Sequence, residues 1–450
     1  MSNDINLNHI EKYQKKILNH IKKYLFKLDR ENINISKSIF CYFGSWDETP
    51  GFLKIKDKIK SNKIKFIGCV IKNILGIGFQ SDYGIFTKGL NNSSKNVILT
   101  WGYKESFDNY GNFHDKYLKI SSKNTKETIW LIVYMDYSLP EKISDNIFVI
   151  YKKKNFFNIF YFFKKIILNL VKYNFNLKNF FHFTSSSTNF GEILINKLEN
   201  LDNFENVKKI YMPYESQIFQ NMFIDFFKKK TKQIKVSGII HDFEPVTPNL
   251  YYNKFSPDFL LLPGKSRKRY FTKYLGWPSK KIITSFSTRY SDEDLSTIFR
   301  NKVLLPSGIY KQKKILESFY NLIKKKPVLV NYIKVRKHPK STSQKLQYAL
   351  ESKINSIIQK NKNKVISKNV HKKFSIVVGI TSLTILLLEK NYRVFHITME
   401  PELQVYTSLF WPEIKVSYLS NNVFEYSLNK GKKIFQFRKK ENLNKHLRLC

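Results

Sequence analysis

The stretch SIVVGITSLTILLLEKNYRVFHI, residues 375–397, decides the fold class. Residues 375–379 are a short apolar run that ends at a glycine, and residues 381–390 have the apolar spacing of a helix. Residues 393–397 are a second short apolar run. A strand, a helix and a strand in this order form one βαβ unit of a parallel sheet. We therefore predict an α/β fold.

The same alternation of short apolar runs and longer amphipathic segments extends over most of the chain, and 450 residues are many for a single core. It predicts two Rossmann-like, doubly wound α/β domains that face each other across a cleft. The expected strands are Ile39–Phe43, Lys65–Ile71, Asn96–Trp101, Ile129–Met135, Ile147–Tyr151, Lys208–Met212, Lys235–His241, Phe259–Leu262, Lys302–Leu305, Tyr332–Arg336, Ser375–Gly379 and Arg393–Ile397. The expected helices are Tyr214–Lys230, Lys311–Lys325, Ser343–Lys360 and Thr381–Lys390.

The polar stretch Ser287–Asn301 separates the two series of elements. We therefore predict a first domain over residues 1–290, a second over 291–430 and a basic tail over 431–450. Apolar residues recur at helical spacing within Met1–Arg30, which predicts an amphipathic helix at the start of the first domain.

The composition is strongly basic, with a formal net charge of +43, and 69 of the 78 basic residues are lysine. Arginine does most specific base reading, so nucleic acid is not an expected partner. Lysine is accompanied by abundant asparagine, isoleucine and phenylalanine, whose codons are also A/T-rich, so much of the charge reflects genomic bias. The remaining charge favours phosphorylated substrates and an anionic bilayer face.

The sequence contains no secretory signal and no run of about 20 apolar residues. The nearest is Phe156–Val171, which Lys164 and Lys165 interrupt. It is either a largely buried helix or a helix lying on a membrane, of which burial is the more common. Three cysteines at unrelated spacings form no disulfide framework or zinc signature and fit a reduced cytoplasmic compartment.

A basic turn closes the expected strand at Arg336 and continues through Lys337, His338 and Pro339. Since side chains at the carboxyl end of a parallel strand line the ligand crevice, this turn is a candidate phosphate site. Its imidazole is placed to stabilise charge on a leaving nucleotide. The alternative is a solvated basic loop with a chance histidine.

A second candidate site follows the buried strand at residues 375–379, where Gly379 makes the turn and Thr381 and Ser382 begin the helix. First-turn amides bind phosphate, and the two hydroxyls either bind the same group or cap the helix. Together with the basic turn, this segment predicts a two-sided phosphate clamp.

Acidic groups follow two strands of the first series. Glu215 and Gln217 begin a helix after one strand, and His241 and Asp242 follow the next. Glu215 is either a general base or a charge that complements the helix N-terminus. Asp242 is an alternative base, and His241 is either a site residue or a satisfied interior histidine.

The aromatic and acidic loop Phe107–Tyr117 contains Asp115 and reads either as a sugar-facing loop or as a packed turn. The sequence has no glycine-rich nucleotide motif, no Walker loop and no metal-spaced set of histidine and cysteine. The acidic triplet at residues 292–294 lies in the polar boundary and not at a strand end, so no metal site is expected.

The order of these motifs resembles GT-B-fold glycosyltransferases, and especially bacterial surface carbohydrate proteins of O-antigen and capsule loci. It also resembles sialyltransferase-like, Kdo-transferase-like and CDP-glycerol glycerophosphotransferase families. The likeness covers roughly Asn96–Ile397, and departs from the related pattern at the His-Asp pair, where Gln-His-Gly is usual. It is carried by Pro-Tyr-Glu-Ser-Gln at 213–217, His-Asp at 241–242, Leu-Pro-Gly at 262–264, Leu-Gly-Trp-Pro at 275–278, Lys-His-Pro at 337–339 and Gly-Ile-Thr-Ser at 379–382.

The resemblance implies an inverting, metal-independent transfer of a sugar from a nucleotide-sugar donor, possibly CMP-linked, with no further cofactor. The first domain would then be the acceptor side and the second the donor side. It implies donor-phosphate contacts for His338, Pro339, Thr381 and Ser382, with Arg336, Lys337 and Gly379 beside them. Glu215 or Asp242 is the expected base, and Gln217, His241 and Asp115 are expected on the acceptor side.

The expected partners are a glycan or lipid-linked acceptor and the anionic inner-membrane surface, which places the enzyme in the cytoplasm, peripherally bound to the membrane. Phosphotransfer or sugar epimerisation on the same fold remains an alternative reaction. A further alternative is that the chain is a non-catalytic protein that binds nucleic acid or membrane.

Overall fold

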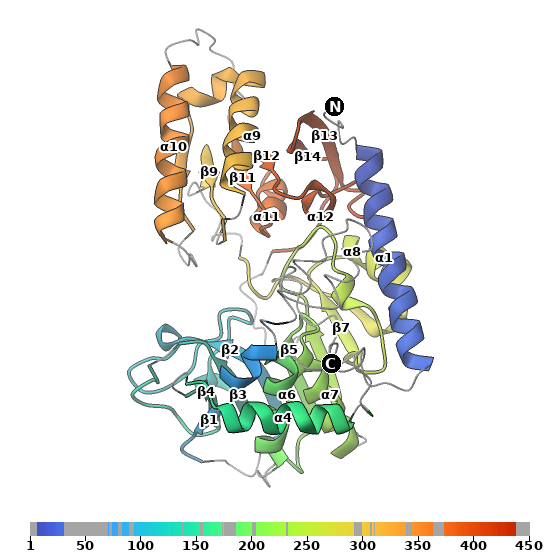
Figure 1. The fold of residues 1–450 in the computed structure, drawn as a ribbon. Coiled ribbons are helices and arrows are strands. Elements are labelled where there is room, and N and C mark those ends of the chain that lie inside the picture. Colours follow the sequence, from blue (N-terminus) through green and yellow to red (C-terminus); the bar gives the residue numbers. More distant parts are fainter. Residues whose placement is uncertain are drawn as a thin grey trace.

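The computed structural model contains two mainly parallel sheets with helices packed against them, so the chain has the predicted α/β fold class with two Rossmann-like domains (Figure 1). The structure describes residues 7–30, 71, 74–79, 83–89, 94–125, 127–136, 138–153, 156–172, 174, 186–199, 204–230, 233–291, 299–306, 308–309, 311–338, 344–362 and 373–437.

The first sheet has eight strands in the order β1-β4-β3-β2-β5-β6-β7-β8. Only β1, at the edge, pairs antiparallel. The central strands are continuous apolar runs, as expected where both faces of a sheet are covered. The strands are β1 (Tyr83–Phe86), β2 (Asn96–Gly102), β3 (Thr128–Tyr134), β4 (Ile147–Lys152), β5 (Lys209–Pro213), β6 (Lys235–Ile239), β7 (Phe259–Leu262) and β8 (Ile282–Thr284).

From β4 to β8 this is the strand order of the Rossmann fold, in which the direction of winding reverses between β2 and β5. Ligands of open α/β sheets bind at the carboxyl ends of the strands beside such a reversal. The loops that begin after Gly102 and Pro213 therefore occupy the position where a site is expected.

The two faces of the first sheet are covered differently. Helices α6 (Ser186–Glu199), α7 (Ile218–Lys230) and α8 (Ser266–Leu275) contribute to the core on one face. On the other face, Phe113, Leu118 and Ile143 from the loops after β2 and β3 fill the core. The short 3-10 helices of this half are η2 (Lys104–Ser106), η3 (Ser122–Asn124), η4 (Pro248–Leu250) and η5 (Ser279–Lys281).

The second sheet has six strands in the order β10-β9-β11-β12-β14-β13. The first four are parallel, and the hairpin of β13 and β14 adds an antiparallel edge. Its strands are β9 (Lys302–Leu304), β10 (Lys334–Arg336), β11 (Phe374–Val378), β12 (Arg393–Ile397), β13 (Ile414–Ser420) and β14 (Val423–Leu428). Its helices are α9 (Gln312–Lys325), η8 (Pro327–Asn331), α10 (Gln344–Lys362), α11 (Leu383–Glu389) and α12 (Pro401–Gln404).

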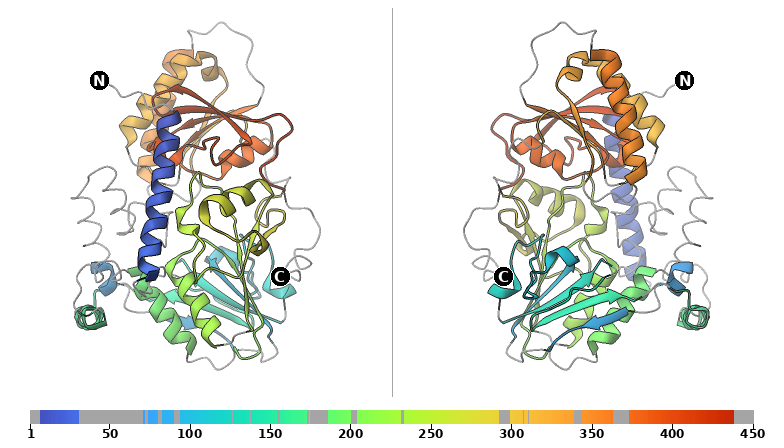
Figure 2. Two further views of the ribbon diagram at one scale, coloured as in Figure 1. Left: turned by 90° about the vertical axis from the view of Figure 1, so that its right-hand side faces the viewer. Right: turned by 90° about the vertical axis from the view of Figure 1, so that its left-hand side faces the viewer.

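Helix α1 (Leu7–Arg30) runs alongside both halves of the molecule (Figures 1 and 2). The amide of Gln14 donates to the Val405 carbonyl at 2.9 Å and accepts from the Thr407 hydroxyl at 2.8 Å. The Tyr251 hydroxyl, from the first half, donates to the Leu18 carbonyl at 3.0 Å. The predicted amphipathic helix thus binds elements on both sides of the predicted boundary.

The chain also returns to the first half after β14. The amide of Gln436 donates to the Pro263 carbonyl at 3.0 Å, and that of Ser287 donates to the Gln436 carbonyl at 2.7 Å. Ile434 and Phe435 are buried there, within the segment assigned to the basic tail. The boundaries at 290 and 430 remain predictions.

All ten expected strands that lie among the described residues are present, each within two residues of its predicted bounds. Residues 39–43 and 65–70 lie outside the described part of the chain, and Ile71 is helical. Strands β1, β8, β13 and β14 and helices α6 and α8 were not predicted. No helix among the described residues is long and apolar enough to span a membrane.

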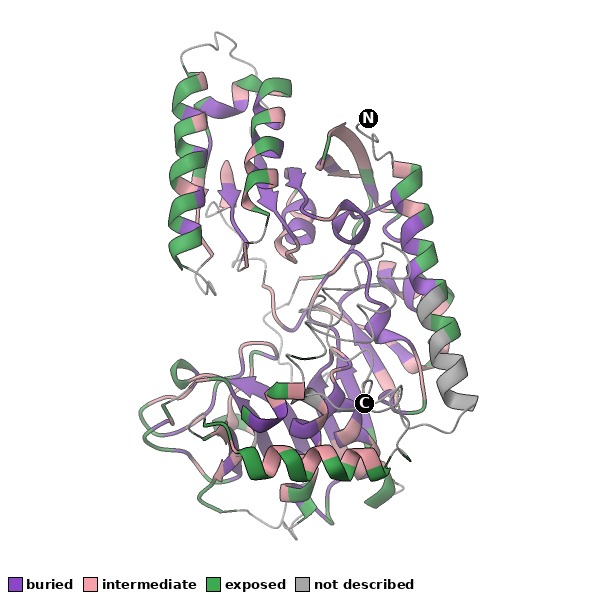
Figure 3. Ribbon diagram, viewed as in Figure 1, coloured by how far each residue is buried: buried purple, intermediate pink, exposed green. Residues whose placement is uncertain are grey.

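Helix α4 (Ile159–Lys172) corrects one expectation. The helix predicted over Phe156–Val171 is present, but the favoured interpretation, that it is buried, is wrong because none of its residues is buried (Figure 3). It contributes no residue to any of the core clusters among the described residues.

Candidate functional site

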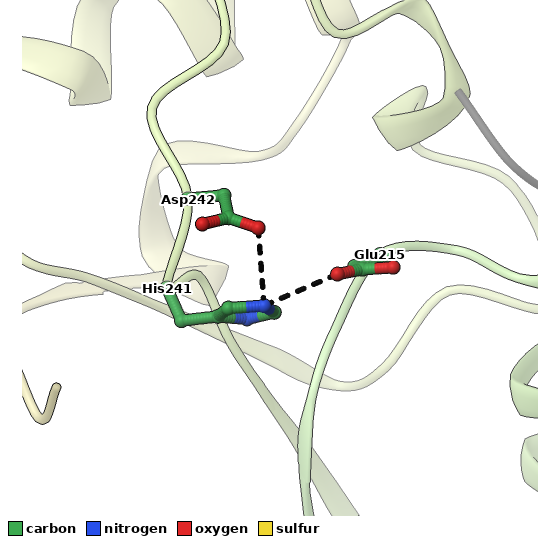
Figure 4. A group of neighbouring side chains, drawn as sticks. All are labelled: Glu215, His241 and Asp242. Carbon is green, nitrogen blue, oxygen red and sulfur yellow. Dashed lines mark ion pairs between the residues drawn. The ribbon is translucent and has the colours of Figure 1, made fainter. Parts of the chain in front are cut away.

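Three ionisable side chains meet at the carboxyl edge of the first sheet. Glu215 follows β5, and His241 and Asp242 follow β6, the next strand in the sheet (Figure 4). The Nε2 atom of His241 lies 3.1 Å from Oε1 of Glu215 and 3.3 Å from Oδ2 of Asp242. The structure thus brings together three residues that the sequence assigned to two separate motifs.

The loop after β5 is fixed by its neighbours. Ser216 has φ +56°, a left-handed conformation that is uncommon for a residue with a side chain. The Oε1 atom of Gln220 accepts hydrogen bonds from the amides of Glu215 and Gln217, and its amide group donates to the Pro213 carbonyl. These bonds delay the start of α7 to Ile218 and turn Glu215 toward β6.

His241 is buried, with 3% of its surface exposed, and its ring packs beside those of Trp101 and Tyr117, which also contact each other. Burial alone would lower the pKa of the imidazole, but attraction to the Asp242 and Glu215 carboxylates outweighs burial and raises the pKa to about 10. Neither carboxylate lies in line with the ring N–H, so the contacts are ionic rather than directed hydrogen bonds. His241 is therefore an imidazolium at neutral pH and is not a proton acceptor there.

Asp242 links this cluster to the second half of the molecule. Its Oδ1 atom accepts from Nη1 of Arg289 at 2.9 Å and from the Ser382 hydroxyl at 3.1 Å. The Ser382 hydroxyl in turn accepts from the amide of Phe243 at 3.1 Å. Although burial opposes ionisation, His241 and Arg289 hold the pKa of the Asp242 carboxyl well below its usual range.

Glu244, two residues after Asp242, has a raised pKa instead of a lowered one. Burial and the neighbouring carboxylates of Asp242 and Glu215 raise its pKa to about 8. A carboxyl that keeps its proton near neutral pH can donate a hydrogen bond or a proton. His241, Asp242 and Glu244, whose pKa values are shifted in different directions, therefore share one strand-end region with Glu215, an arrangement common at functional sites.

The same atoms have the chemistry of a cation site. Glu215, His241 and Asp242 each offer one ligand atom, and these atoms lie within 4.8 Å of one another. A histidine and two carboxylates form a ligand set that suits a divalent transition metal. The cluster can hold either a proton or a cation between its carboxylates, and the expectation of no metal remains a prediction.

The turn after β11 approaches this cluster from the other side. Gly379 has φ +71°, and a Cβ there would lie 2.9 Å from Cε of Met399, so both conformation and space favour glycine. Helix α11 begins at Leu383, and the Thr381 hydroxyl accepts from the Leu383 amide at 3.3 Å. The Ser382 hydroxyl does not cap this helix but points to Asp242 instead.

The basic turn after β10 lies farther away. In the strand order β9 separates β10 from β11, so the two turns are about 10 Å apart along the sheet edge. Nζ of Lys337 lies 3.2 Å from Oε2 of Glu351 on α10 and 3.5 Å from the centre of the Tyr348 ring. The guanidinium of Arg336 stacks on Phe299 at 4.6 Å.

His338 is half-buried, and its amide donates to Oε1 of Gln347 at 2.9 Å. Pro339 lies outside the described residues. The contacts described above attach the basic turn to α10 and Phe299, and its contact with a donor phosphate remains a prediction.

The two other acceptor-side residues take part in local hydrogen bonds. The side-chain amide of Gln217 donates from Nε2 to Oε2 of Glu215 at 2.7 Å. Asp115 is buried, and its carboxylate accepts from the Thr100 hydroxyl and from the amides of Tyr117 and Leu118. It shapes the turn that places the Tyr117 ring against His241, so the loop at residues 107–117 is packed as the second interpretation expected.

Sequence reasoning missed two contributors to this region, since Arg289 was placed in the polar boundary and Tyr406 was not considered. Glu244 was counted with His241 and Asp242 as an ionisable group after this strand but was given no role of its own. The Tyr406 hydroxyl donates to the Phe243 carbonyl at 2.6 Å, another contact between the halves. Arg289 had a usable signal, since it is one of only nine arginines in this lysine-rich chain.

No protein-family model matches the sequence, and no curated protein matches it significantly. Among solved structures, the chain is similar to a trehalose 6-phosphate synthase from Burkholderia multivorans at 9% identity, with a TM-score of 0.32 over 60% of this chain and 68% of that one. It is similar to MnaA of S. aureus, solved with UDP, at 11% identity, with a TM-score of 0.27 over 70% and 77% of the two chains. The wall teichoic acid polymerase TagF matches at 10% identity, with a TM-score of 0.27 over 76% and 77%. The fold class therefore rests on the two sheets of this chain.

Proposed function

We propose that this chain is an inverting, metal-independent glycosyltransferase that moves a sugar from a nucleotide-sugar donor to a glycan or lipid-linked acceptor of surface-polysaccharide synthesis. The observation that carries the proposal is the contact between Asp242 and Ser382. It joins a cluster of acid–base groups from one sheet to a strand-end turn of the other. A transfer reaction needs a base for the acceptor and a binding site for the leaving phosphate within one small volume.

Glu215 is the proposed base. His241 and Arg289 lower the pKa of Asp242, which makes that carboxylate a weak base, so Glu215 is the carboxylate of this cluster that we assign to proton transfer. Glu215 would take the proton of the acceptor hydroxyl as that oxygen attacks the anomeric carbon. The bond between this carbon and the phosphate oxygen would break, and its electron pair would leave with the nucleotide.

The leaving phosphate would be held by the turn at Gly379, Thr381 and Ser382, with Arg336 and His338 completing the donor side. Backbone amides and cationic groups stabilise the negative charge that develops on a departing phosphate. Lys337, paired with Glu351, would position the basic turn after β10 rather than bind the phosphate directly.

The donor nucleotide, for which CMP is the first candidate, can be found by thermal shift with CMP, CDP, UDP and GDP, since a ligand at 100 times its Kd adds about 2.7 kcal/mol of stability. The protein is then incubated with CMP-, UDP- and GDP-linked sugars and a host lipid extract. The proposal predicts nucleotide release from one donor with matching transfer of sugar to lipid. Transfer of phosphorus to the product would indicate a phosphotransferase. Conversion of the sugar in the absence of an acceptor would indicate an epimerase. Release of nucleotide from none of the donors would contradict the proposal. In the cell the enzyme would act at the anionic inner face of the membrane.

A further inference from the structure

The outward face of α4 is apolar. Its exposed large side chains recur at intervals of three and four residues, which places them along one side of the helix. Phe160 is 86% exposed, and Phe163, Ile167 and Val171 are each more than half exposed. Large contiguous apolar patches are rare on soluble monomers and mark surfaces that bind a partner or a membrane.

The orientation of α4 is set by polar contacts on its inward side. The Tyr161 hydroxyl donates to Oδ1 of Asn189 on α6 at 2.9 Å. Lys165 and Lys172 lie 2.9 and 3.2 Å from the carboxylate of Glu192, also on α6. Helix α4 is therefore attached by these polar side chains, with Phe162, Ile166 and Leu170 half-buried on the same side, and it presents a second set of apolar side chains outward.

The apolar surface continues onto the short helix at residues 74–79. The Phe79 ring lies 5.0 Å from the Phe157 ring, centre to centre. Ile71, Leu75 and Phe79 are 52%, 44% and 47% exposed. Both helices stand out from the same side of the first half (Figure 2). We call this surface, formed by residues 71, 74–79 and 156–171, the α4 face.

The segment that contains α4 is rich in lysine, and the acidic residue that the described contacts place against α4 is Glu192, which pairs with Lys165 and Lys172. Residues 146–191 contain seven lysines and no aspartate or glutamate, and Lys164 lies exposed on α4 itself. A second copy of the chain would bring the same lysines together, which like charges oppose. Apolar side chains bordered by lysine match the interface of an anionic bilayer, whose phosphates attract each lysine by about 1 kcal/mol.

We propose that the α4 face docks the protein onto an anionic lipid bilayer. Helix α4, 14 residues and about 21 Å long, would lie in the plane of the interface with its phenylalanines among the acyl chains. The α4 face lies outside the candidate site, and its assignment does not depend on the reaction proposed above.

The test is co-sedimentation of the purified full-length protein with vesicles of phosphatidylcholine alone and of phosphatidylcholine with phosphatidylglycerol. We expect binding to the anionic vesicles only, weakening as salt rises because screening shortens from about 10 Å at 0.1 M to about 3 Å at 1 M. The double variant F160Q/I167Q should reduce binding at least tenfold, since each exposed side chain adds buried apolar area in the interface.

The matched control is Y320S/L346Q, which removes two exposed apolar residues from α9 and α10 in the other half. It should bind vesicles as the unchanged protein does. All substituted residues are exposed, so both variants should keep the melting temperature. Equal binding by F160Q/I167Q and the control would overturn the proposal. So would binding to neutral vesicles as strong as to anionic ones. Self-association abolished by F160Q/I167Q without any vesicle binding would show instead that the α4 face joins two copies of the chain.

Discussion

The carboxyl edges of the two sheets carry motifs of equal promise in the sequence, but the structure treats them differently. Glu215 and His241 follow β5 and β6, which are neighbours, and their side chains meet. His338 and Gly379 follow β10 and β11, which β9 separates. Within one sheet, two strand-end motifs therefore meet where the strand order makes their strands neighbours, and that order is not visible in local patterns.

The two edges also differ in where their charged groups point. Asp242 reaches across to Ser382 of the other half, whereas Lys337 pairs with Glu351 of its own half. If the acidic edge performs proton transfer and the basic edge supports the donor, substitutions at the two edges should have separate effects.

The largest effect is expected at Glu215. A Glu215→Gln variant keeps the shape of the side chain but cannot accept the acceptor proton, so kcat should fall by about 10²–10⁴-fold. The Kd of the nucleotide should stay within about twofold, measured by isothermal titration. Gln217→Ala, which removes only a hydrogen bond to Glu215, is the control and should cost much less. A Glu215→Gln variant with near-normal kcat would move the base to Asp242.

The basic edge should respond next. His338→Ala should lower turnover by about 100-fold if the imidazole stabilises the departing phosphate. The variant keeps the hydrogen bond from the His338 backbone amide to Gln347, and its melting temperature checks that the protein is folded. Near-normal turnover in a folded variant would instead make this turn the solvated loop that was its alternative interpretation.

The pH dependence of stability should separate the contributions of two groups on the acidic edge, Glu244 and His241. The pKa values of His241 and Glu244 are raised in the folded state, to about 10 and about 8, so folding binds protons at both groups. The free energy of unfolding should therefore fall as pH rises, between about 4.5 and 8 through Glu244 and between about 6.5 and 10 through His241. Thermal melts at a series of pH values should show that Glu244→Gln removes the first part of this decline and leaves the second. A decline unchanged in that variant would mean that Glu244 is not coupled to its neighbours.

The smallest effect is expected at the link between the edges. Ser382→Ala removes hydrogen bonds to Asp242 and to the Phe243 amide, each worth about 1 kcal/mol. We expect a KM for the donor raised several-fold with kcat less affected, measured by steady-state kinetics. A change in kcat alone would indicate that the contact serves the chemistry and not the alignment of the two halves.

Most of the sheet strands could be predicted because buried parallel strands are continuous apolar runs, such as 129–133 and 259–262. The missed elements lack that signal. Strand β13 alternates with polar residues on a half-exposed edge, and α8, SRKRYFTKYL, has few apolar residues. Helix α4 was recognised, but its spacing is the same whether its apolar side is inside or outside. The orientation is set by Glu192 on α6, which pairs with Lys165 and so turns the lysine side of α4 inward and the apolar side outward.

The individual residues of the candidate site could be predicted from the sequence, but the contacts between them could not. Strand ends marked Glu215, His241 and Asp242, but the pairing of one imidazole with two carboxylates needs contacts across 26 residues of sequence. Ser382 was expected to bind phosphate or cap a helix, because nothing local indicates a partner 140 residues away.

The most direct test of the central claim is a crystal structure of the protein with the nucleotide that stabilises it most. The claim is that the Asp242–Ser382 contact marks one shared site of the two sheets. It predicts nucleotide phosphates at the turn of residues 379–382, with the sugar side facing Glu215 and His241. A nucleotide bound away from this turn, with Glu215 and His241 remote from its phosphates, would contradict it.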